Sequence, residues 1–259
     1  MLDIAVATRS ERGQRASNQD KVRACREGAR WVAVLADGAG GHEGGAEASR
    51  RAVEVMESVL HEVATEFDPP SLTRAVLSAH AYVQGARDDA HGLERMHSTV
   101  VVLWIDTAAE CALWSHVGDS RLYHARQGTL TLLTSDDSVV QRMVDAGLIT
   151  PQQAEVHPQK SQLIAALGME DDVDPHTVAR PVALREGDAF LLCSDGWWAA
   201  LDERGIIDAL SDAASPDEWL ALMQRAIEER AALAQDNFSA IGVWVGDASE
   251  ATRPMAEDV

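Results

Sequence analysis

The chain has 259 residues, of which 46% are hydrophobic and 25% charged, so it can bury a sizeable core and wholesale disorder is not expected. Its formal net charge of −20 gives a surface that repels phosphate backbones and anionic lipid. This argues against nucleic acid and membranes as partners, and it makes some of the 42 acidic residues candidates for holding cations.

Short segments rich in Val, Leu, Ile and Trp predict β-strands along the whole chain. In chain order they are residues 2–8, 31–36, 99–105, 111–117, 130–134, 189–193 and 238–245.

Segments with helical periodicity lie between these strands. In residues 43–66, apolar side chains recur at i, i+3, i+4 and i+7, as they do at Ala52, Val55, Met56 and Val59. Two prolines then interrupt the pattern, and a second helix is predicted for residues 71–89. A third, residues 216–233, places Trp219 and Met223 on one face.

The order of these elements lacks the regular alternation of strand and helix that builds a parallel sheet. It favours an α+β sandwich of two mainly antiparallel sheets with helices packed outside. Because no low-complexity linker or repeat divides the chain, we expect a single domain over residues 1–246. Residues 247–259 are polar and predict a disordered tail.

The cysteines and the N-terminus bear on redox chemistry and location. Cys25, Cys111 and Cys193 are odd in number, widely spaced and without a CxxC pair, so neither a structural zinc site nor a disulfide framework is indicated. The first residues lack a cationic segment followed by an apolar one, and the apolar run 98–105 is too short to cross a bilayer. A cytoplasmic protein is therefore expected.

Four aspartates stand at the ends of predicted strands. Asp37 and Asp195 each end an apolar strand and precede a glycine, Asp119 follows another apolar strand, and Asp236 lies just before the last one. An Asp-Gly pair alone is more often a turn, but four such carboxylates in one chain indicate convergence. Carboxylates held together repel unless cations neutralise them, and oxygen-only ligands favour Mg²⁺ or Mn²⁺ over zinc.

Two other motifs do not support a function. The Gly-rich stretch 38–45 is not followed by Gly-Lys-Ser/Thr and lacks the GxGxxG order, so it is no nucleotide loop. Residues 61–65 (HEVAT) begin like a zinc-protease helix, but Thr65 stands where the second histidine belongs. This segment is interpreted as a helix face.

The aspartates belong to a set of motifs that resembles the metal-dependent type 2C protein serine/threonine phosphatases, bacterial type. The motifs occur in the family's order: RASNQD at 15–20, ADGAGGH at 36–42, HST at 97–99, VGDSR at 117–121, CSDG at 193–196 and DN at 236–237. The resemblance implies an αββα sandwich with a flap insert at about residues 136–180. It also implies an Mn²⁺- or Mg²⁺-dependent enzyme that hydrolyses phosphoserine and phosphothreonine in proteins by a metal-bridging hydroxide.

The same resemblance implies roles in a centre of two metal ions, with a weaker third. Asp37 would bridge two ions, and the Gly38 carbonyl would complete one site. Asp195 and Asp236 would hold the second ion. Asp119, together with Asp195, would frame the third.

It further implies that Asp20 acts through metal-bound water, that Arg15 grips the substrate phosphate, and that His42 is the general acid for the leaving alkoxide. On the residues alone, an exposed structural arginine and a surface histidine remain open alternatives. Two departures from the family pattern are Gln19, where glutamate is usual, and Asp137, where histidine is common.

The partners that this resemblance implies are phosphorylated proteins and a cognate serine/threonine kinase whose signalling the enzyme would reverse, with the phosphatase acting as a monomer. Arginine greatly outnumbers lysine, which suits a bacterial origin. Two alternatives stay open: a catalytically weak relative that binds phosphoproteins, and a phosphatase of small molecules.

Overall fold

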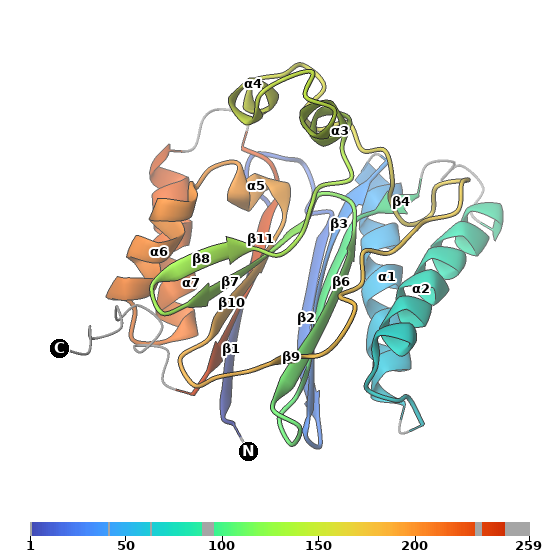
Figure 1. Ribbon diagram of the computed structural model, residues 1–259. Helices are drawn as coiled ribbons and strands as arrows, with labels where there is room; N and C mark the ends of the chain where they lie inside the picture. The colour runs from blue at the N-terminus through green and yellow to red at the C-terminus, as the bar shows by residue number, and fades with distance from the viewer. Residues whose placement is uncertain (1, 41, 63, 90–95, 231–234, 247–259) are drawn as a thin grey trace.

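The structure is a computed structural model that describes residues 2–40, 42–62, 64–89, 96–230 and 235–246. Two β-sheets pack face to face, and helices cover the outer face of each, so the layers run helix, sheet, sheet, helix (Figure 1). The predicted α+β sandwich of two antiparallel sheets is confirmed. The predicted tail at 247–259 lies outside the described residues.

One sheet has five strands in the spatial order β1-β11-β10-β7-β8, and every neighbouring pair is antiparallel. The strands are β1 (Ile4–Glu11), β11 (Phe238–Val245), β10 (Ala189–Cys193), β7 (Arg121–Arg126) and β8 (Thr129–Leu132). The last strand of the chain therefore lies between the first strand and β10.

The other sheet has the order β2-β3-β5-β6-β9, also antiparallel, with β4 paired to the end of β3. Its strands are β2 (Asp20–Glu27), β3 (Arg30–Ala39), β4 (His97–Ser98), β5 (Val100–Asp106), β6 (Cys111–Val117) and β9 (Val182–Ala183).

The longest helices cover the sheets and shorter ones follow strands or lie in the flap insert (Figure 1). The six-stranded sheet is covered by α1 (His42–His61) and α2 (Pro69–Asp89). The five-stranded sheet is covered by α6 (Glu203–Asp212) and α7 (Pro216–Arg230), and α5 (Asp195–Trp198) follows β10. The flap insert carries α3 (Val139–Asp145) and α4 (Pro151–Glu155) at one end of the sandwich.

The core has three layers, because side chains alternate between the two faces of each strand. Leu35 and Leu103 meet Leu192 and Ile241 between the sheets. Trp104 packs under the first helix pair, and Trp219 of α7 packs against Trp244 of β11 under the second. All three side chains are fully or almost fully buried. Each large apolar side chain buried in this way contributes about 1.5–3 kcal/mol to stability.

Three strands match the predicted bounds, at residues 111–117, 189–193 and 238–245. The prediction missed β2 and β7, whose sequences alternate apolar with charged residues (DKVRACRE and RLYHAR). It also extended the first helix to residue 66, although α1 ends at His61. Beyond this point the Thr65 hydroxyl donates a hydrogen bond to the Val59 carbonyl at 2.8 Å and occupies one of the free acceptors at the helix end.

The prediction also missed α6, although this helix carries apolar side chains on one face. The third predicted helix corresponds to α7, and its predicted end at 231–233 lies outside the described residues. Within the described ranges, no helix combines the length and apolarity needed to cross a membrane.

Candidate metal centre

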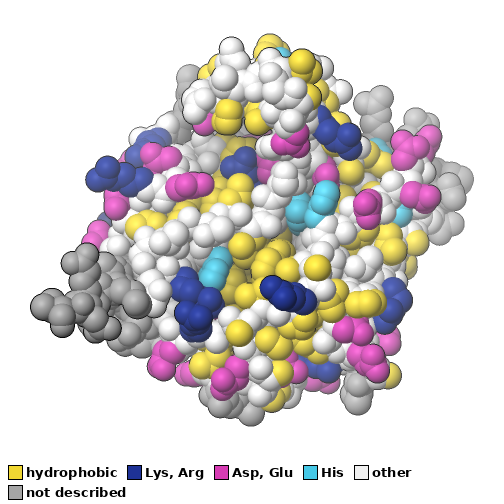
Figure 2. Space-filling model, in the orientation of Figure 1, with side chains coloured by type: hydrophobic (Ala, Val, Ile, Leu, Met, Phe, Trp, Pro, Cys, Tyr) yellow, Lys and Arg dark blue, Asp and Glu magenta, His cyan; other side chains and the backbone are white. Residues whose placement is uncertain are grey.

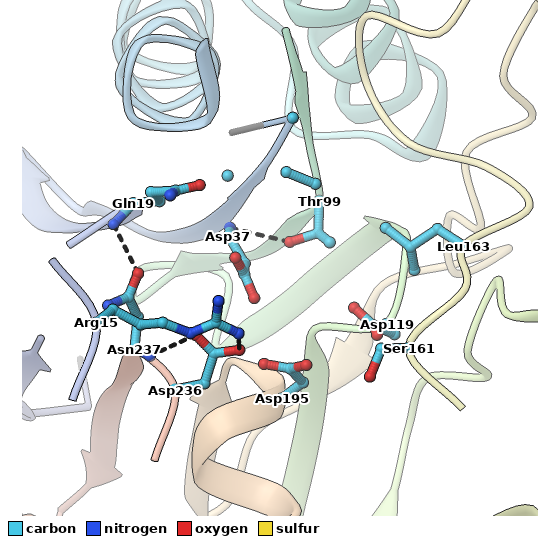
Figure 3. Close-up of a pocket in the computed structure, with 13 residues that line it drawn as sticks. Arg15, Gln19, Asp37, Thr99, Asp119, Ser161, Leu163, Asp195, Asp236 and Asn237 are labelled. Atoms are coloured by element: carbon cyan, nitrogen blue, oxygen red, sulfur yellow. Dashed lines mark hydrogen bonds and ion pairs between the residues drawn. The ribbon is translucent and has the colours of Figure 1, made fainter. Parts of the chain in front are cut away.

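A cavity of about 290 Å³ opens at the end of the sandwich that the flap insert covers. Both sheets and the flap insert contribute to its walls (Figure 3). The lining residues are Arg15, Gln19, Asp37, Gly38, Ala39, Gly40, Thr99, Asp119, Ser161, Leu163, Asp195, Asp236 and Asn237.

The cavity lies where the apolar layer between the sheets gives way to polar side chains. In β3, Ala33 and Leu35 belong to the layer between the sheets, and Asp37 is next in the same alternation. In β10, Leu192 belongs to that layer and Ser194 follows it in phase. The strand periodicity therefore aims these polar groups inward at the edge of the core.

The backbone around Asp37 is fixed by a neighbouring segment. Its N–H donates to Thr99 Oγ1 at 3.0 Å, and its carbonyl accepts from the Thr99 N–H at 2.8 Å. The Ser98 hydroxyl donates to the same carbonyl at 3.0 Å. Burial and the neighbouring carboxylates, Asp20 foremost, raise the pKa of Asp37 well above its usual value. Protonation of the carboxyl group, or a nearby cation, removes the free-energy cost of holding a buried negative charge beside other carboxylates.

Gly38 is required by the close approach of β3 and α1. A Cβ built at this position would lie 2.1 Å from the Gly45 carbonyl oxygen and 2.8 Å from that of Gln19. The Gly38 N–H donates to the Gln19 carbonyl at 3.2 Å. The absence of a side chain thus brings the start of α1 against the strand that carries Asp37.

Asp20 lies directly opposite Asp37 in the pairing of β2 with β3. Only 7% of it is exposed, and its Oδ2 accepts a hydrogen bond from the Ser194 hydroxyl at 2.8 Å. Its Oδ1 is buried with no hydrogen-bond partner among the described residues. Burial raises the pKa of Asp20. Buried polar atoms normally have a hydrogen-bond partner, and a water molecule bound to a cation in the cavity would provide one for this oxygen.

Asp119 and Asp195 come from different sheets and face each other across the cavity (Figure 3). Asp119 follows β6 and is 6% exposed; burial and the charge of Asp195 raise its pKa well above the usual value. Asp195 begins α5, and burial together with the charge of Asp236 raises its pKa to about 6. These shifts share one cause, since the carboxylates are both desolvated and mutually repelling.

The segment that carries Asp119 is held by an aromatic and an arginine side chain. Trp198 Nε1 donates to the Asp119 carbonyl at 3.0 Å. The Arg121 guanidinium lies 3.6 Å from the centre of the Trp198 ring and forms two hydrogen bonds to Asp136, of 3.0 and 2.8 Å. This stack ties the end of β6 to α5 and to the first residue of the flap insert.

Arg15 reaches the cavity from the loop between β1 and β2 and pairs with Asp236 at 2.5 Å. The two side chains are 55% and 38% exposed, so the pair lies at the cavity mouth. Asn237 accepts from the Gln19 N–H at 2.8 Å and donates to the carbonyls of Arg12 and Ser17, which fixes this loop.

The donor set fits hard divalent cations. The cavity is lined by four carboxylates, and Arg15 is the one cationic side chain among the described residues that line it. None of those described lining residues is a histidine or cysteine, the ligands that favour zinc. Clustered carboxylate ligands are the arrangement that Mg²⁺ or Mn²⁺ neutralises, and the raised pKa values of Asp37, Asp119 and Asp195 reflect their mutual repulsion and burial.

Most of the predicted site residues meet at this cavity. Asp37, Gly38, Asp119, Asp195, Asp236 and Arg15 line it, and Asp20 lies beside it. Gln19, the departure from the family pattern, also lines it. The side chain of His42 lies outside the described part of the structure, and only its place as the first residue of α1 is established.

Asp137, the second departure from the family pattern, does not line the cavity and has a structural role. Its Oδ2 accepts from the Gly118 N–H at 3.0 Å, and its Oδ1 lies 2.9 Å from His176 Nε2. Its own N–H donates to the Gly118 carbonyl at 2.9 Å. Asp137 thus fastens both ends of the flap insert to the end of β6.

Sequence reasoning assigned no role to Thr99, Ser161, Leu163 or Asn237, which also line the cavity. Thr99 and Asn237 belong to recognised motifs, so their positions carried a signal. Ser161 and Leu163 lie in the flap insert and are brought in by the bridge between Ser138 and Leu163. Nothing in the local sequence around them indicates that contact.

Comparison with known proteins agrees with this arrangement. A family model described as protein phosphatase 2C matches residues 8–238. The serine/threonine protein phosphatase PstP of Mycobacterium tuberculosis is 37% identical over 210 residues, which are 81% of this chain but 39% of PstP. The protein phosphatase PhpP of Streptococcus pneumoniae is 34% identical over 188 residues, 71% of this chain and 74% of PhpP.

A crystal structure of the PstP catalytic domain in complex with two manganese ions superposes with a TM-score of 0.81 at 30% identity, covering 95% of this chain and 100% of that one. The family match spans the motifs that build the cavity, from Arg15 to Asp236. The chain belongs to the protein phosphatase 2C family.

Proposed function

We propose that this chain is an Mn²⁺- or Mg²⁺-dependent protein serine/threonine phosphatase. The observation that carries the proposal is the convergence of four carboxylates from two sheets on one cavity, with an arginine at its mouth. Family membership and the manganese-bound PstP structure support the same activity. The chain spans 39% of PstP, so the support concerns the part of that protein that it matches.

The carboxylates divide naturally into ion sites. Asp37 would be shared by two ions, the Gly38 carbonyl would complete one site, and Asp195 and Asp236 would hold the second ion. Asp119 and Asp195 would frame a third site, and Asp20 would act through metal-bound water. When bound, such ions polarise phosphoryl oxygens and lower the pKa of water, which is the chemistry that phosphomonoester hydrolysis needs.

The chain's own side chains then bind and orient the substrate. Arg15 keeps N–H groups beyond the one paired with Asp236, and its planar guanidinium matches phosphate oxygens. The Gln19 amide, facing the same cavity, can orient water but adds no charge. His42, at the start of α1, supplies the proton to the leaving serine or threonine oxygen.

The flap insert, residues 136–180, supplies the outer wall through Ser161 and Leu163. It also exposes Leu148 and Val156, whose exposed fractions are 73% and 83%. In Figure 2, apolar side chains are visible over the end of the molecule where Figure 1 places α3 and α4. These side chains favour contact with a protein substrate over a small sugar phosphate.

The proposed substrates are phosphoproteins, and the proposed partner is a cognate serine/threonine kinase whose targets the enzyme dephosphorylates in the cytoplasm. We propose that the enzyme acts as a monomer with one catalytic domain over residues 1–246. Family membership and the names of the bacterial relatives support phosphoproteins as the substrates.

The test measures hydrolysis of p-nitrophenyl phosphate, phosphothreonine peptides and sugar phosphates with Mn²⁺, with Mg²⁺ and with EDTA. The proposal expects metal-dependent turnover, with the phosphopeptide preferred over sugar phosphates. Asp37→Asn and Asp236→Asn should each reduce turnover by orders of magnitude while the fold is retained. Phosphopeptide binding without turnover, or preference for sugar phosphates, would favour one of the two alternative functions instead.

A further inference from the structure

A second group of metal-ligating side chains lies on the outer side of the six-stranded sheet, away from the cavity. Cys25 on β2 meets Glu57 and His61 on α1, and one ligand atom of each lies within 4.8 Å of the other two. The Cys25 Sγ is 3.7 Å from His61 Nε2. All three residues are half-buried at the boundary between the strand and the helix.

The fold brings these residues together by two periodicities. In β2, Val22 and Ala24 pack in the layer between the sheets, so Cys25 faces α1 and joins the core beneath that helix. On α1, Glu57 and His61 are four residues apart and share a face. Figure 1 shows α1 lying along the sheet beside β2. Because Cys25 and His61 are 36 positions apart, sequence spacing gave no sign of a zinc-class site.

We propose that Cys25, Glu57 and His61 form a binding site for a divalent ion of the zinc class, separate from the carboxylate centre. A thiolate, an imidazole and a carboxylate are the ligand types of zinc sites, with water in the fourth position. Ligands of a tetrahedral zinc ion lie about 3.5 Å apart, given metal–ligand bonds of about 2.0–2.3 Å. The observed spacing needs only small side-chain adjustments to reach that geometry.

The surroundings of the trio suit a bound cation. Arg23 donates two hydrogen bonds to Glu57, and both end on Oε1, so Oε2 remains for an ion. Such a contact orients a ligand from outside the coordination sphere. His61 also lines a surface hollow of about 260 Å³, together with three carboxylates (Glu27, Glu62 and Asp106) and one guanidinium (Arg30). A hydrated ion can reach the imidazole through this opening, in which these acidic side chains outnumber the guanidinium.

Binding at this site must displace a proton. Burial, with the charge of Glu57, raises the pKa of the Cys25 thiol to about 11, so the thiol is protonated at neutral pH. A zinc-class ion replaces that proton and neutralises the repulsion between thiolate and carboxylate. The bound ion would tie the C-terminal end of α1 to β2, and β2 begins at Asp20 beside the cavity.

The test is cobalt substitution in the full chain, with the carboxylate centre first filled by excess Mn²⁺. Cobalt bound by a thiolate gives a sulfur-to-metal charge-transfer absorption that carboxylate ligands cannot give. The wild type should show this band, and added Zn²⁺ should remove it by displacement. Cys25→Ser should lack the band, and His61→Ala should weaken cobalt affinity by about tenfold or more.

Cys111→Ser is the matched control, because Cys111 is also free and half-buried but lies on β6. It should keep the band. Circular dichroism and Mn²⁺-dependent turnover verify that each variant is folded. The proposal is overturned if the folded wild type shows no band, if Cys25→Ser retains it, or if Cys111→Ser loses it.

Discussion

Replacing Asp195 with asparagine should have opposite effects on stability without and with metal. In the metal-free protein, burial and the charge of Asp236 raise the pKa of Asp195 from 3.8 to about 6. Each pKa unit is worth about 1.4 kcal/mol, so the ionised carboxylate costs about 3 kcal/mol of unfolding free energy at pH 7. Asparagine has the same shape without the charge, so we expect it to stabilise the metal-free protein by about 1–3 kcal/mol. The lower value applies if the amide group does not form all of its hydrogen bonds.

The pH dependence has a definite sign. Because the folded state of the metal-free protein holds the Asp195 proton up to about pH 6, while the unfolded chain releases it near pH 4, the folded state binds more protons between these values. The stability contribution of this group is therefore greatest at low pH and is lost as the pH rises from about 4 to about 6. The variant should lack this component of the pH profile.

Manganese should reverse the ranking of the two proteins. An ion at a hundred times its dissociation constant adds about 2.7 kcal/mol to the wild type, and it also relieves the repulsion among the carboxylates. The variant has lost a ligand and should gain much less. The assay is urea unfolding in EDTA and in Mn²⁺ at several pH values, with turnover measured in parallel.

Asp208→Asn, on the exposed face of α6, is the control for removal of a negative charge. Its side chain is 66% exposed, so it should change stability by no more than about 0.5 kcal/mol in either condition. If Asp195→Asn destabilises the metal-free protein, or if Mn²⁺ stabilises the variant as much as the wild type, the reasoning about repelling carboxylates is refuted.

Three further predictions concern the substrate, the strand–helix contact and the flap insert. Arg15→Ala should raise KM for phosphopeptides about tenfold or more while changing unfolding free energy by less than about 1 kcal/mol, since its pair with Asp236 is exposed; an unchanged KM would contradict phosphate binding by this residue. Gly38→Ala should destabilise the protein by about 1–3 kcal/mol or more in urea unfolding, because its Cβ would meet the Gly45 carbonyl at 2.1 Å, and wild-type stability would show that the strand and helix can separate there. Asp137→Ala removes two side-chain hydrogen bonds and should cost about 1–3 kcal/mol and speed proteolysis within the flap insert; a cleavage rate equal to that of the wild type would argue against anchoring.

The sequence indicated the centre well because its ligands stand at the ends of strands. Asp37 and Asp195 follow runs of apolar residues, and such runs predict buried strands from the sequence alone. Two antiparallel sheets packed face to face bring the ends of these strands to one edge of the sandwich. The resemblance to a known family placed the remaining ligands. β2 was missed because its charged residues alternate with apolar ones at the edge of a sheet, so its hydrophobic signal is weak.

Other features depend on how distant segments pack, and no local pattern carries that information. Leu163 reaches the cavity because of the path of the flap insert. Cys25 and His61 meet only when α1 packs beside β2. The glycine at position 38 was expected to turn a carbonyl toward an ion, and the structure adds a second reason for it, since the helix leaves no room for a side chain.

The most direct test of the central claim is anomalous diffraction at the manganese absorption edge from crystals soaked in Mn²⁺. The account predicts anomalous peaks within bonding distance of carboxylate oxygens of Asp37, Asp195 and Asp236. A well-ordered cavity without such peaks, in crystals of protein whose turnover requires Mn²⁺, would contradict it.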